Sequence, residues 1–338
     1  MKATELSNLP VHPSEVPAGK PHKWALWLAR QYDKGPRSLE LNLAVPRQDA
    51  ESSFERALRL VHDVYVKKQY IAPRPSGLHL NLFLLLPRSR TFMIHVGHRV
   101  IGTLSVVLDS PFGLPVDALY PEALEQLRQS LPVPSEEVAM LSQLFWDSTD
   151  FAPLEKFVNL ESTRIGELTA FALDEAFQSH TVSSASISLE LMRTSYKYSV
   201  MAGVCGYVVE VNRSHAQFYE RFWGFKTIAT GRVFPADQEP AVAMNCSPLE
   251  LTKNFAEAEK SAGGIESLLL LKQREHDVLA AAVQVPLMSA DTLRYFLEHR
   301  FHPEEPSVWE RAAPPERAAF EKAYQPFGYD FSWAHHDR

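Results

Sequence analysis

The chain has 338 residues, enough for one large domain or two smaller ones, and its 45% hydrophobic and 22% charged residues are typical of a folded protein in water. A formal net charge of -7 argues against a nucleic-acid-binding surface, because such surfaces concentrate Lys and Arg. No segment approaches the roughly 20 apolar residues of a membrane helix, and the first twenty residues lack the apolar stretch of a secretory signal. We therefore expect a cytoplasmic protein without a membrane span.

The first third of the sequence predicts an irregular arm, a helix and a group of strands. Residues 1–22 contain four prolines among polar residues, which favours an irregular N-terminal arm. Apolar residues recur at steps of three and four over 50–69, the pattern of an amphipathic helix. Three runs rich in β-branched and large apolar residues then predict an antiparallel meander, with strands at 80–86, 91–96 and 100–108.

The middle of the chain predicts a second group of strands with helices between them. A short helix is expected at 121–129, and the proline-containing stretch 130–162 is interpreted as an insertion with a possible helix at 135–146. The elements expected after it are a strand at 165–173, a helix at 183–201, a strand at 206–211, a helix at 215–223, and strands at 225–234 and 241–246. This order predicts a mixed α/β sheet with one parallel pair and an antiparallel end.

The last ninety residues differ in character from the rest. Helical composition marks 249–260, 265–279, 290–300 and 315–324. We therefore predict three parts: the arm 1–22, a main domain 23–248 containing the insertion, and a helical C-terminal extension 249–338 packed on the main domain. The extension should pack back because its leucine-rich and aromatic segments are too apolar to remain exposed.

Cysteines and histidines give no metal site. Cys205 and Cys246 are too few for a disulfide framework or a cysteine-based metal site, so both are expected to be buried thiols. His95 and His98 flank a predicted hairpin turn, but a third ligand cannot be placed beside them. They are interpreted as ordinary hairpin histidines, and no metal is predicted.

One segment carries a family resemblance. In 211–226, Asn212 ends a predicted strand, Tyr219 follows seven residues later on a helix, and Gly224 and Phe225 open the next strand. This arrangement resembles the closing motif of GNAT acyltransferases. The Gly-Phe pair comes one residue later than in most acetyltransferases, and this longer form resembles the N-acyl amino acid synthases.

Further stretches resemble the long-chain N-acyl amino acid synthase branch, which is related to the autoinducer synthases. The most specific is 100–117, a Gly-Thr strand followed by Asp-Ser-Pro-Phe-Gly-Leu-Pro; weaker support comes from 64–66, 165–169 and 287–289. The resemblance spans roughly residues 50 to 300. It implies a GNAT-like α/β fold for 23–248, with a mixed, mostly antiparallel central sheet flanked by helices.

The resemblance also implies where the chemistry occurs. In GNAT folds two parallel strands splay apart, and the backbone between them holds a pantetheine arm; here these strands are 165–173 and 206–211. The implied donor-binding residues are Leu168, Thr169, Ala170 and Asn212. Tyr219 resembles the residue that protonates the leaving thiolate, the alternative being a core aromatic. Glu167 is the candidate base for the acceptor amine, the alternative being an exposed or ion-paired strand residue.

Three further charged residues are candidates for acceptor binding. Asp109 and Asp117 flank the proline-rich loop, although aspartates in such loops also cap turns. Arg164 precedes Glu167 by three positions, whereas in the autoinducer synthases a Glu precedes an Arg at this spacing. The two charges are therefore exchanged in this chain.

The donor is predicted from a missing motif. Acetyltransferases that use coenzyme A carry a glycine-rich turn after the first splayed strand, whose amides bind pyrophosphate. Residues 174–184 contain two acidic residues and no glycine, so this stretch should repel the nucleotide half of coenzyme A. We therefore predict an N-acyltransferase without a bound cofactor. It would move a medium or long acyl chain from a pantetheine thioester, on acyl carrier protein rather than coenzyme A, to an amino acid or similar small amine. The alternative is a catalytically inactive GNAT-like protein that binds a lipid or a partner.

Overall fold

The structure is a computed structural model, and it describes part of the chain. The described residues are 40–43, 53–131 apart from 88, 97–98 and 111, 165–177, the pairs 187–188, 191–192, 195–196 and 198–199, then 202–233, 240–251 apart from 249, and 290–335 apart from 326–327. The predicted arm 1–22, the insertion from 132 onward, the helix at 265–279 and Arg164 lie outside these residues.

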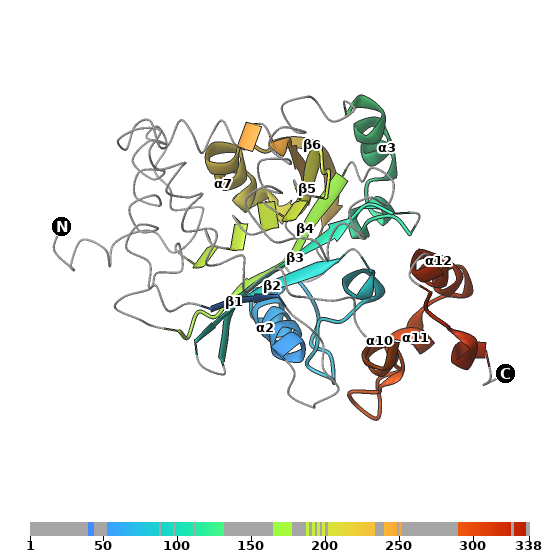
Figure 1. The fold of residues 1–338 in the computed structure, drawn as a ribbon. Helices are drawn as coiled ribbons and strands as arrows, with labels where there is room; N and C mark the ends of the chain where they lie inside the picture. Colours follow the sequence, from blue (N-terminus) through green and yellow to red (C-terminus); the bar gives the residue numbers. More distant parts are fainter. Residues whose placement is uncertain are drawn as a thin grey trace.

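A seven-stranded sheet forms the centre of the molecule (Figure 1). Its strands are β1 (Glu40–Leu43), β2 (Arg90–Val96), β3 (Arg99–Leu108), β4 (Ile165–Leu173), β5 (Gly206–Asn212), β6 (Lys226–Val233) and β7 (Pro240–Cys246). The spatial order is β1-β2-β3-β4-β5-β7-β6, and every neighbouring pair is antiparallel except β4 with β5. The predicted mixed, mostly antiparallel sheet with one parallel pair is therefore confirmed.

The helices frame this sheet. They are α2 (Ser53–Lys67), α3 (Pro121–Ser130), α7 (Arg213–Trp223), α10 (Ala290–Glu298), α11 (Val308–Arg311) and α12 (Pro314–Tyr324), with short 3₁₀ turns η3 (Leu82–Leu85), η4 (Pro115–Ala118) and η6 (Ser332–His335). The predicted helices at 50–69, 121–129, 215–223, 290–300 and 315–324 are confirmed to within a few residues. Strand β1 and helix α11 were not predicted.

The predicted strand at 80–86 is wrong. Residues 82–85 instead form the turn η3, because the Asn81 side chain caps it by accepting a hydrogen bond from the Leu84 amide (3.1 Å). Leu82, Leu84 and Leu85 are all buried, so this run is apolar on every side. A short run of this kind has no alternation from which a strand could be distinguished.

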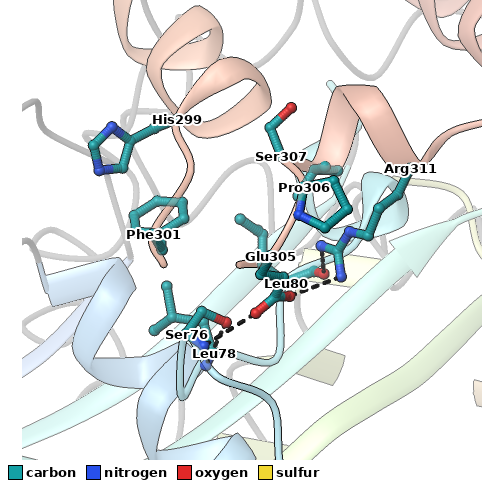
Figure 2. Close-up of a pocket in the computed structure, with 10 residues that line it drawn as sticks. Ser76, Leu78, Leu80, His299, Phe301, Glu305, Pro306, Ser307 and Arg311 are labelled. Atoms are coloured by element: carbon teal, nitrogen blue, oxygen red, sulfur yellow. Dashed lines mark hydrogen bonds and ion pairs between the residues drawn. The ribbon is translucent and has the colours of Figure 1, made fainter. Parts of the chain in front are cut away.

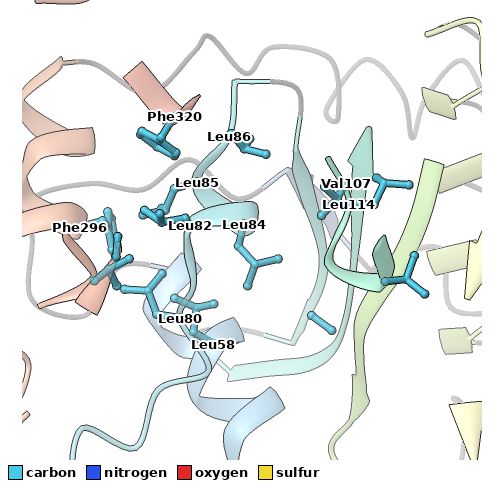
Figure 3. Close-up of a cluster of buried hydrophobic side chains, with 14 of the residues drawn as sticks. Leu58, Leu80, Leu82, Leu84, Leu85, Leu86, Val107, Leu114, Phe296 and Phe320 are labelled. Atoms are coloured by element: carbon cyan, nitrogen blue, oxygen red, sulfur yellow. The ribbon is translucent and has the colours of Figure 1, made fainter. Parts of the chain in front are cut away.

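Helix α2 covers one face of the sheet, against β3 and β4 (Figure 1). The cluster of buried side chains on this face joins α2, the 78–86 segment, the loop after β3 and the C-terminal helices (Figure 3). It includes Leu58 of α2, Val107 of β3, Val208 of β5 and Phe320 of α12. The C-terminal segment 290–335 thus shares a hydrophobic core with the sheet.

The opposite face carries α7 and the helical residues between 187 and 199. Their buried side chains, among them Leu191 and Trp223, form a second cluster with β3, β5 and β7. Gly102 of β3 permits this packing, because a Cβ there would lie 2.5 Å from Cγ2 of Ile187. The glycine of the Gly-Thr strand therefore allows close approach of a helical segment to the sheet.

Both cysteines are buried free thiols, as expected. Burial raises the pKa of the Cys246 thiol to about 12, so it remains protonated and unreactive at neutral pH. Neither cysteine contributes to the site described below.

Candidate active site

The parallel strands β4 and β5 separate part of the way along their length. Their pairing covers three positions and ends where Glu167 lies opposite Val208. Beyond this point β4 continues to Leu173 paired only with β3, and β5 continues to Asn212 paired only with β7. Two inner strand edges therefore face each other without a shared ladder, and their backbone groups are available to a third partner.

A bulge in β4 accompanies the separation. Ser105 pairs with Thr169 and Thr103 with Ala172, so β4 holds one more residue than β3 in this interval. Ala170 lies in this interval with a φ of 51°, in the left-handed region that non-glycine residues seldom adopt. Strain of this type persists where the surrounding structure enforces it, and it concentrates at functional sites.

Glu167 occupies the last paired position and is buried, with 4% of its surface exposed. Its Oε2 accepts a hydrogen bond from the Val116 amide (2.9 Å). Burial raises the pKa of this carboxyl to about 8, the Val116 amide opposes the change, and the nearby carboxyls of Glu210 and Asp117 add to it. A carboxyl with a pKa near neutrality can exchange a proton at physiological pH.

The loop that presents Val116 is fixed by charged side chains. Arg128 of α3 binds Asp109 through Nε (2.9 Å) and Asp117 through a second nitrogen (2.6 Å). Asp117 Oδ2 also accepts the Leu114 amide (2.7 Å), whereas its Oδ1 is buried with no hydrogen-bond partner among the described residues. The two predicted acceptor residues thus lie together, and only Asp117 keeps an oxygen without a partner.

Tyr219 lies on α7, half-buried between aromatic rings. It makes edge-to-face contacts with Phe218 (5.8 Å between centroids) and Phe225 (5.6 Å). Burial, followed by the neighbouring Tyr70, raises the pKa of its hydroxyl to about 12. The hydroxyl therefore remains protonated at neutral pH, with a proton that can be donated in a hydrogen bond.

Tyr65 was not singled out from the sequence as a site residue. Its hydroxyl lies at the backbone amide of Phe171, on the β4 edge beyond the bulge. Burial raises the pKa of this hydroxyl, and the nearby charges of Tyr219 and Glu167 raise it further. Its ring packs edge-on against Tyr70 and His79. The sequence signal that could have identified Tyr65 is its place in the 64–66 stretch, which resembles the N-acyl amino acid synthases.

In the turn after β4, two backbone amides donate hydrogen bonds within the turn itself. The Ala176 amide donates to Asp174 Oδ1 and the Phe177 amide to the Asp174 carbonyl, both at 3.0 Å. The two acidic side chains of the turn are also paired with cations, Asp174 with Arg99 and Glu175 with both Lys67 and Lys68. The negative charge expected to repel a nucleotide is therefore balanced, and the amides of Ala176 and Phe177 are occupied; residues 178–184 lie outside the described part of the chain.

The remaining predicted residues have clear positions. Leu168 and Thr169 precede the bulge on β4, and Asn212 is buried at the start of α7, at the far end of the β5 edge. In the described part of the chain no three His, Cys, Asp or Glu residues gather to hold a metal. The side chain of His95 and all of His98 are outside the described residues.

A shallow pocket lies elsewhere, between the loop after α2 and the C-terminal segment (Figure 2). Glu305 links its two sides, accepting from the Ser76 amide (3.0 Å) and pairing with Arg311 (3.0 Å). None of the predicted site residues lines it. No helix in the described residues is long and apolar enough to cross a membrane.

Comparisons with known proteins identify the family of this chain. The sequence model of the N-acyl amino acid synthase FeeM family matches residues 56–247. Since this is more than half of the chain, the protein belongs to that family. It is an acyltransferase of the N-acyl amino acid synthase type.

Solved structures and curated proteins were also compared. The chain is similar to FeeM, an N-acyl amino acid synthase from uncultured soil microbes, with 21% identity over 60% of this chain and 94% of that chain, at a TM-score of 0.43. It is also similar to the AHL synthase LasI, with 15% identity over 64% and 95% of the two chains and a TM-score of 0.42. A third similar structure is that of the CoA-dependent acyl-homoserine lactone synthase BjaI with SAM and isopentyl-CoA. It shares 13% identity over 66% of this chain and 90% of that chain, at a TM-score of 0.41. No curated protein matches.

Proposed function

We propose that this acyltransferase moves a medium or long acyl chain from a pantetheine thioester to the amino group of an amino acid or a similar small amine. The observation that carries the proposal is the buried Glu167 at the point where β4 and β5 separate. Acyl transfer to an amine needs one group that removes a proton from the nitrogen and others that stabilise the developing oxyanion and thiolate.

Glu167 is the proposed base. Its pKa of about 8 keeps it largely protonated at pH 7. An incoming ammonium group would favour the ionised carboxylate, because an opposite charge within a few ångströms stabilises the charged form. Binding of the amine would release the carboxyl proton to solvent and leave a carboxylate that accepts one proton from the ammonium group. The neutral nitrogen then attacks the thioester carbonyl, and collapse of the tetrahedral intermediate breaks the C–S bond, expels the thiolate and releases the remaining extra proton of the nitrogen to solvent.

The acceptor amine is proposed to bind beside Asp117. Its Oδ1 is the buried oxygen without a partner among the described residues, and its charge reaches Glu167. Buried polar atoms are normally paired, so an ammonium donor fits this position. Asp109 would act on the acceptor side through Arg128, which it shares with Asp117. Arg164, outside the described residues, remains a predicted acceptor residue and suits the carboxylate of an amino acid.

The donor is proposed to lie along the open β4 edge. Leu168, Thr169 and Ala170 would line the pantetheine arm, and the Phe171 amide beyond the bulge faces the hydroxyl of Tyr65. The thioester carbonyl would take the place of the Tyr65 hydroxyl at this amide, which would then stabilise the oxyanion formed from that carbonyl. Asn212, at the end of the β5 edge, is the proposed donor contact across the opening.

Tyr219 is proposed to assist the departing sulfur. A hydroxyl with a pKa of about 12 does not readily give up its proton, so its role is to donate a hydrogen bond that stabilises the thiolate. This role differs from full protonation, which would require a hydroxyl of lower pKa.

Acyl carrier protein is the favoured donor. Pyrophosphate binding requires free backbone amides, and those of Ala176 and Phe177 are already engaged by Asp174. The missing glycine supports the same conclusion, whereas charge repulsion contributes less than expected, because Arg99, Lys67 and Lys68 neutralise the acidic residues.

The donor proposal is tested with one acyl chain on two carriers. We expect kcat/KM for the acyl carrier protein thioester to exceed that for the matching acyl coenzyme A by at least about tenfold, equivalent to roughly 1.4 kcal/mol. The assay follows release of the thiol in the presence of a mixture of amino acids, and mass spectrometry identifies the amide. Equal values for the two donors would remove the carrier-protein proposal.

A further inference from the structure

The C-terminal segment 290–335 lies beyond the family match, which ends at residue 247. Its side chains nevertheless enter the same hydrophobic cluster as the loop that contacts Glu167 (Figure 3). Phe320 of α12 is fully buried, and Leu114 and Val116 of the loop are each 1% exposed within this cluster. The segment is therefore part of the packing around the proposed base.

A direct aromatic contact joins the two parts. Phe320 meets Phe112 of the loop edge-on (6.1 Å between ring centroids), and Phe112 meets Phe83 in the same manner (4.9 Å). The hydroxyl of Tyr324, also on α12, donates to the Leu85 carbonyl. Helix α12 thus holds both the loop and the 82–85 turn on which the loop rests.

The loop transmits this position to the carboxyl group. Gly113 follows Phe112 with a φ of 84°, and the chain then turns so that the Leu114 amide binds Asp117 and the Val116 amide binds Glu167. Only three residues separate Phe112 from Val116, whose amide donates to the proposed base. A displaced Phe112 ring therefore moves the one amide that opposes the rise in the Glu167 pKa.

We propose that Phe112 and Phe320 are positioning residues for acyl transfer, through which the C-terminal segment aligns Glu167. This inference rests on the proposed function, because it takes Glu167 as the base. Neither ring is among the groups proposed to contact the substrate. Their role is to keep the Val116 amide directed at Oε2, so that the carboxyl has the orientation and proton affinity that the reaction requires.

The test compares Phe320→Leu and Phe112→Leu with the matched control Phe301→Leu. Phe301 belongs to the same segment, but its ring packs against Tyr295, Phe296 and His299. In the acyl carrier protein assay we expect both test variants to lose about tenfold in kcat with little change in the donor KM. Their kcat/KM profile should also shift to higher pH, because loss of the Val116 amide raises the pKa of Glu167.

Two further variants make the outcome decisive. Phe112→Tyr keeps the aromatic ring and should show the wild-type pH profile. The ring of Phe112 is only half-buried, so Phe112→Leu provides the test if Phe320→Leu does not fold. Profiles of both Leu variants that match Phe301→Leu, with Glu167→Gln inactive, would overturn this inference alone. Full activity of Glu167→Gln would overturn it together with the proposed base.

Discussion

The substitution Glu167→Gln should make the protein more stable at neutral and alkaline pH while removing its activity. Glutamine keeps the shape of the side chain and an oxygen that accepts the Val116 amide, but it does not ionise. In the wild type the buried carboxyl must ionise as the pH rises, and burial opposes this. The folded state therefore holds the proton more tightly than the unfolded state.

The size of the effect follows from the two pKa values. The carboxyl titrates at 4.5 without perturbation and at about 8 in the fold. Each pKa unit corresponds to about 1.4 kcal/mol, so the difference in the free energy of unfolding is at most roughly 5 kcal/mol. Below pH 4.5 both states are protonated and the full contribution to stability is present; it is lost progressively as the pH rises to about 8. The free energy of unfolding of the Gln variant should therefore rise relative to that of the wild type over this same pH interval.

Urea denaturation of both proteins at pH 4.5, 6, 7 and 8.5 measures this difference in the free energy of unfolding. Glu175→Gln is the control, because hydrogen bonds from Lys67 and Lys68 lower the pKa of Glu175. The stability that ionised Glu175 contributes is present above its unfolded pKa and is lost as the pH falls. The Glu175→Gln variant should therefore become less stable relative to the wild type as the pH rises. A Glu167→Gln difference that is independent of pH would refute the reasoning.

Four further outcomes are expected. Tyr219→Phe should lower kcat more than it raises KM, as measured by steady-state kinetics; unchanged turnover would leave the residue a packing role. Arg128→Met should destabilise the protein by about 2 kcal/mol in urea denaturation, because Asp109 and Asp117 lose their shared donor; a change near zero would contradict this. Truncation after Pro248 should give insoluble protein, since it exposes the cluster that the C-terminal segment covers, and a soluble, well-folded fragment would show the segment to be independent. Activity should survive EDTA; loss that zinc restores would show a metal requirement.

Much of the fold could be predicted because its elements carry strong periodic signals. Helix α2 and strands β3, β4 and β5 lie within a few residues of their predicted bounds. The failure at 82–85 has a local cause, since a run buried on all sides loses the alternation that marks a strand. Strand β1 was missed because a four-residue edge strand gives too short a pattern.

The candidate site was predictable in residue type but not in environment. The family resemblance led to the selection of Glu167, yet the burial of its side chain and the hydrogen bond from the Val116 amide are seen only in the fold. Arg128 of α3 binds Oδ2 of Asp117, whereas Oδ1 has no partner among the described residues. Contacts of this kind join segments distant in sequence, which no local pattern encodes. Tyr65 was overlooked for the same reason, because its hydroxyl meets the β4 edge only in the folded chain.

The most direct test of the account is to incubate the purified protein with a dodecanoyl thioester of acyl carrier protein and a mixture of amino acids, and to identify the products by mass spectrometry. The account predicts an N-acyl amino acid formed by the wild type and absent with Glu167→Gln. Hydrolysis to the free fatty acid without any amide product, or equal amide formation by Glu167→Gln, would contradict it.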